Sequence, residues 1–165
     1  MAEKPNRTTI ELNIRRAGRD EAIQLTSLAL DAKRYWGYPE SWINYWESDL
    51  TISPDFINDN PVYVAEANGE LCGFYALMIH HGTAELEHMW VAPQHIGTGL
   101  GKELFLHAME MAASMKVAEL QISADPNAAG FYQRMGATKI GETESPVGGL
   151  ERKLPRFRID PSRKV

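Results

Sequence analysis

Residues 90–112 read WVAPQHIGTGLGKELFLHAMEMA, and this stretch decides the fold. β-prone and turn residues lead into Gly97, Gly99 and Gly101, and no helix breaker follows before Ala113. Because glycine is costly inside regular structure, its spacing here needs a reason. A glycine loop that opens a helix forms an anion site, since the first N–H groups of a helix lack partners. The stretch predicts phosphate binding, although a tight turn without a ligand explains the glycines alone equally well.

Two familiar phosphate loops fit this stretch poorly. A P-loop ends in Gly-Lys-Ser/Thr, whereas Glu103 follows Gly101-Lys102 here. A Rossmann loop follows the first strand of a βαβ unit, whereas this loop lies past the middle of the chain. The sequence therefore gives little support to a nucleotide-binding α/β protein.

The flanking sequence predicts an α/β (α+β) sandwich with a mixed sheet. Asn68-Gly69, the preferred pair for a tight hairpin turn, separates two β-rich runs. Asp125 is placed to cap a helix that starts with Pro126 and stops at Gly136. The expected strands are 10–14, 62–67, 70–79, 84–91, 117–123, 137–142 and 150–159, and the expected helices are 19–33, one from Pro39, 100–113 and 126–135.

Composition sets broad limits on the function. The 165 residues suit one domain, and the formal net charge of −5 argues against non-specific nucleic-acid binding. Cys72 is the sole cysteine, so no internal disulfide is expected. The N-terminus lacks the apolar region of a signal peptide, and no run is long enough to span a membrane. We therefore expect a cytoplasmic protein with no membrane or nucleic-acid partner.

The stretch VAPQHIGTGLG resembles the acyl-CoA pyrophosphate loop of the GNAT superfamily of N-acetyltransferases, whose usual form is Arg/Gln-Gly-x-Gly-x-Gly/Ala. The three glycines match, but Ile96 replaces the Arg or Gln. A second register that starts at Gln94 leaves Gly101 unexplained. The loss of the first side chain is expected to weaken the loop modestly, because main-chain N–H groups make most of the contacts.

The stretch ADPNAAGFYQRMGATKIGE resembles the family's second motif, Asn-x-x-Ala-x-x-Phe/Leu-Tyr-x-x-x-Gly-Phe/Ala. The matching residues are Ala128, Phe131, Tyr132, Gly136 and Ala137. Asp125 holds the usual Asn position and Asn127 lies two residues on, so the sequence leaves open which of them meets the pantetheine arm.

The resemblance implies one GNAT-like domain over residues 1–165, with a mostly antiparallel sheet flanked by helices on both faces. It implies acetyl transfer from acetyl-CoA to a primary amine by direct attack, with a small molecule favoured over a protein as acceptor and no metal. A homodimer is compatible with this assignment. The cofactor-binding residues that it implies are Met89, Trp90, Val91, Ile96, Gly97, Thr98, Gly99, Leu100, Gly101, Lys102, Asp125, Asn127 and Phe131.

Three side chains are candidates for proton transfer. The attacking amine must lose a proton, since an alkylamine is almost fully protonated at neutral pH. Glu85 and Glu87 are expected on one face of the strand that ends at Val91, with His88 on the other. Either glutamate is a candidate base, and a salt-bridged carboxylate is the alternative. Tyr132 matches the family's acid and is expected to donate a hydrogen bond to the leaving sulfur.

The acceptor site is expected around residues 32–50, which are rich in aromatic side chains. Tyr35, Trp36 and Tyr38 flank Gly37 in a predicted loop, and are the candidate substrate-binding residues. An aromatic wall suits a cation or an apolar group, whereas neighbouring charges would select a charged end. A non-catalytic acyl-CoA sensor on the same fold is the main alternative to an enzyme.

Overall fold

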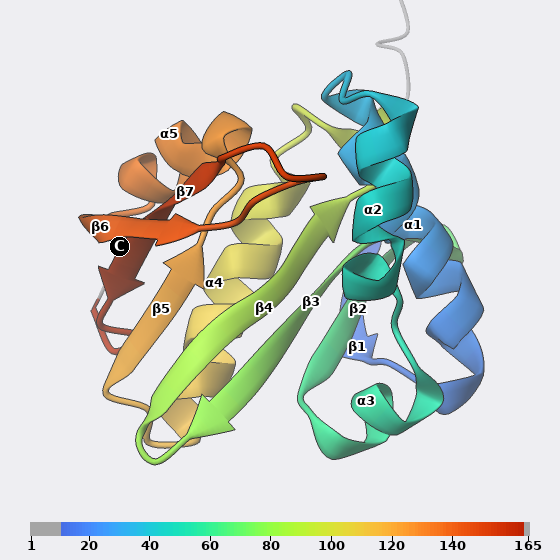
Figure 1. Cartoon of the computed structure of the whole chain (residues 1–165). Coiled ribbons are helices and arrows are strands. Elements are labelled where there is room, and N and C mark those ends of the chain that lie inside the picture. The colour runs from blue at the N-terminus through green and yellow to red at the C-terminus, as the bar shows by residue number, and fades with distance from the viewer. Residues whose placement is uncertain (1–10, 164–165) are drawn as a thin grey trace, which may run out of the picture.

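The sheet of the computed structural model, which describes residues 11–163, has seven strands in the order β1-β2-β3-β4-β5-β7-β6 (Figure 1). Only the β4–β5 pair is parallel, which confirms the mixed, mostly antiparallel sheet. The strands are β1 (Leu12–Arg16), β2 (Val62–Ala67), β3 (Glu70–His80), β4 (Thr83–Val91), β5 (Glu119–Ser123), β6 (Thr138–Glu144) and β7 (Lys153–Ile159). Ile10, where the first strand was expected to start, lies outside the described residues.

Helices cover both faces of the sheet, each over its own hydrophobic core. One core packs α4 (Leu100–Ser114) and α5 (Ala129–Arg134) against the sheet. The other packs α1 (Ala22–Tyr35), α2 (Glu40–Leu50) and α3 (Pro54–Asp59) against the opposite face. From Phe74 to Leu77 the side chains of β3 alternate between the two cores, as a period of two requires. No helix among residues 11–163 is long and apolar enough to cross a bilayer.

Local sequence signals explain most of the elements. Asn68 and Gly69 both adopt positive φ, 52° and 82°, as the hairpin turn between β2 and β3 requires. The sequence did not predict α3, although Ser53 caps it by accepting from the Phe56 N–H and Pro54 occupies its first turn. Three-residue 3₁₀ turns precede α1 and α5, at Arg19–Glu21 and Pro126–Ala128.

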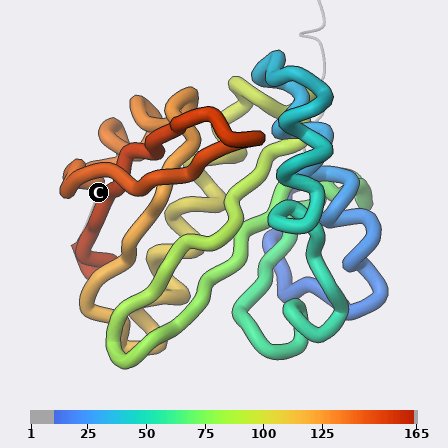
Figure 2. Tube along the Cα trace, viewed as in Figure 1, coloured from blue at the N-terminus to red at the C-terminus, as the bar shows by residue number. Residues whose placement is uncertain are grey.

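The segment between β6 and β7 reaches over the end of β4 towards α2 (Figure 2). Val147 from this segment is 1% exposed and packs in the core that α1, α2 and α3 share. Arg152, at the end of the same segment, donates a hydrogen bond to the Tyr38 hydroxyl. The segment therefore bridges from β6 and β7 to the α1–α2 side of the molecule, at the carboxyl end of β4.

Candidate active site

The parting of β4 from β5 creates the central feature of the site. The two strands pair in parallel only from Thr83 to Glu85 and from Glu119 to Gln121. Leu86 and residues 88–91 of β4 remain paired with β3 but have no β5 partner. Among the described residues, this half of β4 therefore presents an unpaired backbone edge.

The register shows which amides face this open edge. The Ala92 N–H donates to the Cys72 carbonyl of β3 at 2.9 Å. Because amides alternate along a strand, the Trp90 N–H also faces β3, and the N–H groups of Met89 and Val91 face the open side. Of the three backbone positions that the sequence singled out, Met89 and Val91 are therefore placed to bind a ligand through their amides.

The glycine loop lies directly beyond this edge and opens α4. Gly97 and Gly99 have φ of 81° and 87°, a left-handed conformation that strongly favours glycine. Gly99 is the N-cap residue and supplies no side-chain cap. Among the described residues, no acceptor pairs with the N–H groups of Gly97, Gly99, Leu100, Gly101 and Lys102. These amides, at the positive end of a helix dipole, form an anion site.

The second motif packs against this loop. A Cβ built on Gly101 would lie 3.7 Å from the Phe131 ring and 3.8 Å from Val91. Phe131 also contacts Phe105 of α4 edge-on, with ring centroids 6.0 Å apart. The structure therefore brings together the loop, the end of β4 and α5, three segments that the sequence assigned to one site.

Tyr132 is 6% exposed and packs among Phe105, Phe131 and Phe157. Its hydroxyl has no hydrogen-bond partner among the described residues, so the donor is free for a ligand. Burial, with a smaller contribution from the charge of Asp125, raises the pKa of Tyr132. The hydroxyl is therefore protonated at neutral pH and acts as a donor.

The prediction of which face of β4 carries the His88 side chain was wrong. The pairing with β3 shifts between Ala76 and Leu77, which face His88 and Leu86, so Glu87 is a bulge residue. The bulge reverses the alternation that a regular strand would keep. Leu86 accordingly packs towards α4, whereas His88 contacts Phe56 and Phe74 on the side of α1, α2 and α3.

The two glutamates differ in their partners. Glu85 Oε1 lies 2.6 Å from Arg156 Nη2, and Glu85 Oε2 is buried without a partner among the described residues. Arg156 also donates to Gln121 and Ser123 of β5. Glu87 has no ion pair or hydrogen bond among the described residues, and its side chain is exposed. Partial desolvation, followed by the charges of Glu85 and Asp49, raises the pKa of Glu87.

His88 is a buried, neutral side chain. Its Nδ1 accepts from the Trp90 indole N–H at 3.1 Å, which places the proton of the neutral ring on Nε2. Burial lowers the pKa of His88 to about 4 from an ordinary value of 6.5. The protonated form is thus disfavoured in the folded state.

We predict that His88 makes the fold sensitive to mild acid. Well above pH 6.5 the His88 ring is neutral in both the folded and the unfolded protein, so it adds no pH dependence to the free energy of unfolding. Between pH 6.5 and 4 only the unfolded state gains the proton, so the free energy of unfolding falls, by about 2 kcal/mol at pH 5. Urea unfolding at pH 7.5 and pH 5 measures this loss, and His88→Gln should reduce it. An equal loss in wild type and His88→Gln would assign the acid sensitivity to other groups.

A buried ionic cluster lies beyond the end of β4, and we call Lys33, Tyr38, Asp125 and Arg152 the Asp125 cluster. Lys33 Nζ lies 2.7 Å from Asp125 Oδ2, and both side chains are 9% exposed. The Tyr38 hydroxyl lies 3.0 Å from both oxygens of Asp125. The Lys33 and Asp125 charges attract each other, but burial is the larger influence on Lys33 and lowers its pKa. The sequence indicated Asp125 and Tyr38 but not Lys33 or Arg152, because no spacing relates residues so far apart.

The remaining candidates lie around these features. The Asn127 side chain donates to Tyr38 and Asp125, and its N–H donates to Asp125. The Thr98 hydroxyl donates to the His95 carbonyl, and Lys102 is exposed beside the loop. Tyr35 and Trp36 are exposed and contact each other edge-on. Ile96 is half-buried at the start of the loop.

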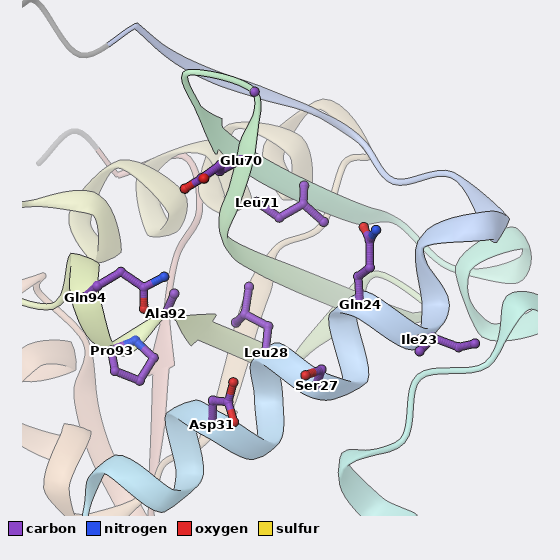
Figure 3. Close-up of a pocket in the computed structure, with 11 residues that line it drawn as sticks. Ile23, Gln24, Ser27, Leu28, Asp31, Glu70, Leu71, Ala92, Pro93 and Gln94 are labelled. Carbon is purple, nitrogen blue, oxygen red and sulfur yellow. The ribbon is translucent and has the colours of Figure 1, made fainter.

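A separate pocket lies between α1, the β2–β3 turn and residues 92–94 (Figure 3). Leu28 and Leu71 line it together with polar side chains such as Asp31, Glu70 and Gln94. None of the residues that the sequence singled out as site residues lines this pocket. It is therefore distinct from the open edge of β4.

Residues 58–136 match the family described as Acetyltransferase (GNAT) domain. The 5-NmdU N-acetyltransferase of Pseudomonas phage PaMx11 is 32% identical over 88 residues, 52% of this chain and 63% of the phage protein. The peptidyl-lysine N-acetyltransferase YjaB of Salmonella typhimurium is 27% identical over 153 residues, 90% of this chain and 97% of that protein. The chain thus matches less than two thirds of the length of the phage relative.

Solved structures share the fold. PaiA N-acetyltransferase from Thermoplasma acidophilum, solved in complex with coenzyme A, gives a TM-score of 0.74 at 20% identity, covering 92% of this chain and 99% of that one. Residues 58–136 thus resemble the GNAT acetyltransferase domain, and the chain shares its fold with this solved N-acetyltransferase.

Proposed function

We propose that this protein transfers the acetyl group of acetyl-CoA to a primary amine of a small molecule by direct attack. The observation that carries the proposal is the parting of β4 from β5 beside the uncapped N-terminus of α4. This arrangement supplies two sets of free amides, one on a strand edge and one at a helix end. They suit a ligand that joins an amide-containing arm to a phosphate group.

The residues fit acetyl-CoA, which supplies the acetyl group on a thioester. The free N–H groups from Gly97 to Lys102 would hold the pyrophosphate, because no Cβ at Gly97 or Gly99 stands in the way. The amides of Met89 and Val91 would bind the arm or stabilise the charge that develops on the carbonyl oxygen. The side chain of Phe131 would close the site beside Gly101.

The surroundings of the acceptor side favour a small molecule. The segment between β6 and β7 reaches over the end of β4 and contacts the α1–α2 side through Val147 and Arg152 (Figure 2). The names of the two relatives specify different acceptors, a 5-NmdU compound and a peptidyl lysine, and share only the transfer of an acetyl group to nitrogen. A segment that reaches over the end of β4 leaves less room for a side chain presented by a folded protein than for a compact amine.

We propose Glu87, directly or through a water, as the base that takes the amine proton. Glu87 has no cation partner among the described residues, whereas Arg156 neutralises Glu85. Partial desolvation raises the pKa of Glu87, which makes its carboxylate a stronger base. Tyr132, whose pKa is raised, would donate a hydrogen bond to the departing sulfur rather than transfer its proton fully.

A screen of small amines and amino acids with acetyl-CoA, read out as free CoA, tests the proposed function. Amine-dependent CoA release is the expected result, and a lysine peptide in the same screen tests the protein acceptor. Binding of acetyl-CoA without turnover of any amine or peptide would instead support the non-catalytic sensor. Faster release with the peptide than with every small amine would contradict a small-molecule acceptor.

Tyr132→Phe is expected to lower kcat by about 10- to 300-fold and to leave the KM for acetyl-CoA nearly unchanged. Phenylalanine keeps the ring that packs among Phe105, Phe131 and Phe157 but removes the hydroxyl. The loss should lie at the low end of the range for a positioned acid, since a thiolate is already a fair leaving group. Steady-state kinetics on a variant with a native circular dichroism spectrum measures it. A wild-type kcat would assign Tyr132 a packing role only.

A further inference from the structure

The Asp125 cluster holds two cations and one carboxylate. Lys33 and Arg152 both face Asp125, at 2.7 Å and 3.5 Å, and no other carboxylate forms an ion pair with either of them among the described residues. The three charged side chains are 9%, 11% and 9% exposed for Lys33, Arg152 and Asp125. An unmatched positive charge at such burial is unfavourable unless an anion joins it.

Arg152 has hydrogen-bond donors that no acceptor among the described residues satisfies. Its Nη2 donates to the Tyr38 hydroxyl at 2.9 Å, whereas Nε and Nη1 have no acceptor among the described residues. Among the described residues, Glu85 Oε2 is the one fully buried side-chain nitrogen or oxygen without a hydrogen-bond partner. Nε and Nη1 of Arg152 are therefore not fully buried. The free nitrogens of Arg152 therefore reach solvent-accessible space. Each of these nitrogens can donate a charge-assisted hydrogen bond to a carboxylate oxygen.

The aromatic side chains around the cluster already bind the protein's own cations. Lys33 Nζ lies 4.3 Å from the centre of the Trp46 ring and 5.0 Å from that of Tyr38. The Arg152 guanidinium lies 4.8 Å and 5.3 Å from the same two rings. These rings are therefore not a free cage for an ammonium group, and the charge that the cluster lacks is negative.

The cluster borders the proposed acceptor side. Lys33 Nζ lies 5.8 Å from the centre of the Trp90 ring on β4, and Asp125 influences Tyr132 electrostatically. We infer that the acceptor carries a carboxylate as well as its primary amine, and that Arg152 binds this carboxylate as a specificity-determining residue. Resting on the proposed function, this inference narrows the acceptor class to amino acids and related amino carboxylates.

The test compares amino acids with their amides as acceptors. Each pair has nearly the same shape, and the amide's amine has the lower pKa, so a preference for the acid cannot arise from easier deprotonation. The wild type should favour the acid by about 10- to 100-fold in kcat/KM, the factor typical of a charge-assisted hydrogen-bonded pair. In Arg152→Gln this preference should disappear through a raised KM for the acid, while the KM for acetyl-CoA is retained. Arg152→Lys should retain part of it.

Arg152→Gln is expected to fold, because Lys33 still neutralises Asp125. Arg19→Gln, which removes an exposed arginine paired with Asp55, is the matched control and should keep the preference. Equal use of acid and amide by the wild type, or an unchanged preference in Arg152→Gln, would overturn the inference while leaving acetyl transfer intact.

If no amine is turned over, the proposed function fails and binding decides the inference. With CoA present, the acids but not the amides should then raise the melting temperature of the wild type, and Arg152→Gln should lose this response. No difference between acids and amides would overturn the inference.

Discussion

Glu87→Gln is expected to lower kcat by a factor of about 100 to 10,000, the range for a positioned general base. The bulge on β4 sets Glu87 apart from the regular ladder, and no cation neutralises it among the described residues. Glutamine keeps the size of the side chain and cannot accept the proton of the amine. Steady-state kinetics from pH 6 to pH 9 measures the loss, and the wild-type rate should rise with pH as the amine becomes neutral.

Glu85→Gln is the matched control for this experiment. It lies two residues away, but its carboxylate is paired with Arg156. We expect Glu85→Gln to lower kcat by less than about tenfold, well under the effect of losing a positioned base. The reverse order of effects would make Glu85 the base. Wild-type rates in both variants would leave proton removal to water or to the substrate.

Asp125→Ala is expected to lower the free energy of unfolding by about 3–5 kcal/mol, because it leaves two buried cations without a carboxylate. For a domain of this size, that loss corresponds to a drop of about 6–20 °C in melting temperature. Thermal unfolding followed by circular dichroism measures it. Asp55→Ala, which removes an exposed partner of Arg19, should change stability by less than about 1 kcal/mol.

A double-mutant cycle separates the charge effect from lost packing. Adding Lys33→Met to Asp125→Ala removes one of the unpaired cations, so part of the lost stability should return. Equal melting temperatures for Asp125→Ala and Asp55→Ala would show that the Asp125 cluster contributes little to the fold.

Local signals made much of this fold predictable. Asn68-Gly69 specified a hairpin, and the glycines from 97 to 101 specified a strand, a loop and a helix in that order, as the structure confirms. The apolar periodicity of α1 was less informative. The apolar side chain of Ile23 is 85% exposed, because the helix turns Ala22, Leu25 and Ala29 towards the sheet.

The features that the sequence did not reveal depend on distant residues. The position of His88 follows from a bulge that only the pairing of β3 with β4 creates. The Asp125 cluster joins side chains that are 92 and 87 positions apart, and Arg152 is 114 positions from Tyr38. Neither periodicity nor turn chemistry carries information at such separations. The sequence therefore indicated the loop that would bind CoA but not the charges on the acceptor side.

The central claim is that the glycine loop binds acetyl-CoA, and calorimetric titration of acetyl-CoA into the wild type and Gly99→Asp tests it most directly. A Cβ at Gly99 meets no atom within 4 Å, so the variant should fold despite a strained φ of 87°. Gly82→Asp is the control, since φ there is 82°, the surroundings are equally open and the turn lies at the far end of β4. We predict that wild type and Gly82→Asp bind acetyl-CoA, whereas Gly99→Asp binds at least about 100-fold more weakly, because its carboxylate meets the phosphate. No binding to the wild type at millimolar acetyl-CoA, or equal binding to all three proteins, would contradict the account.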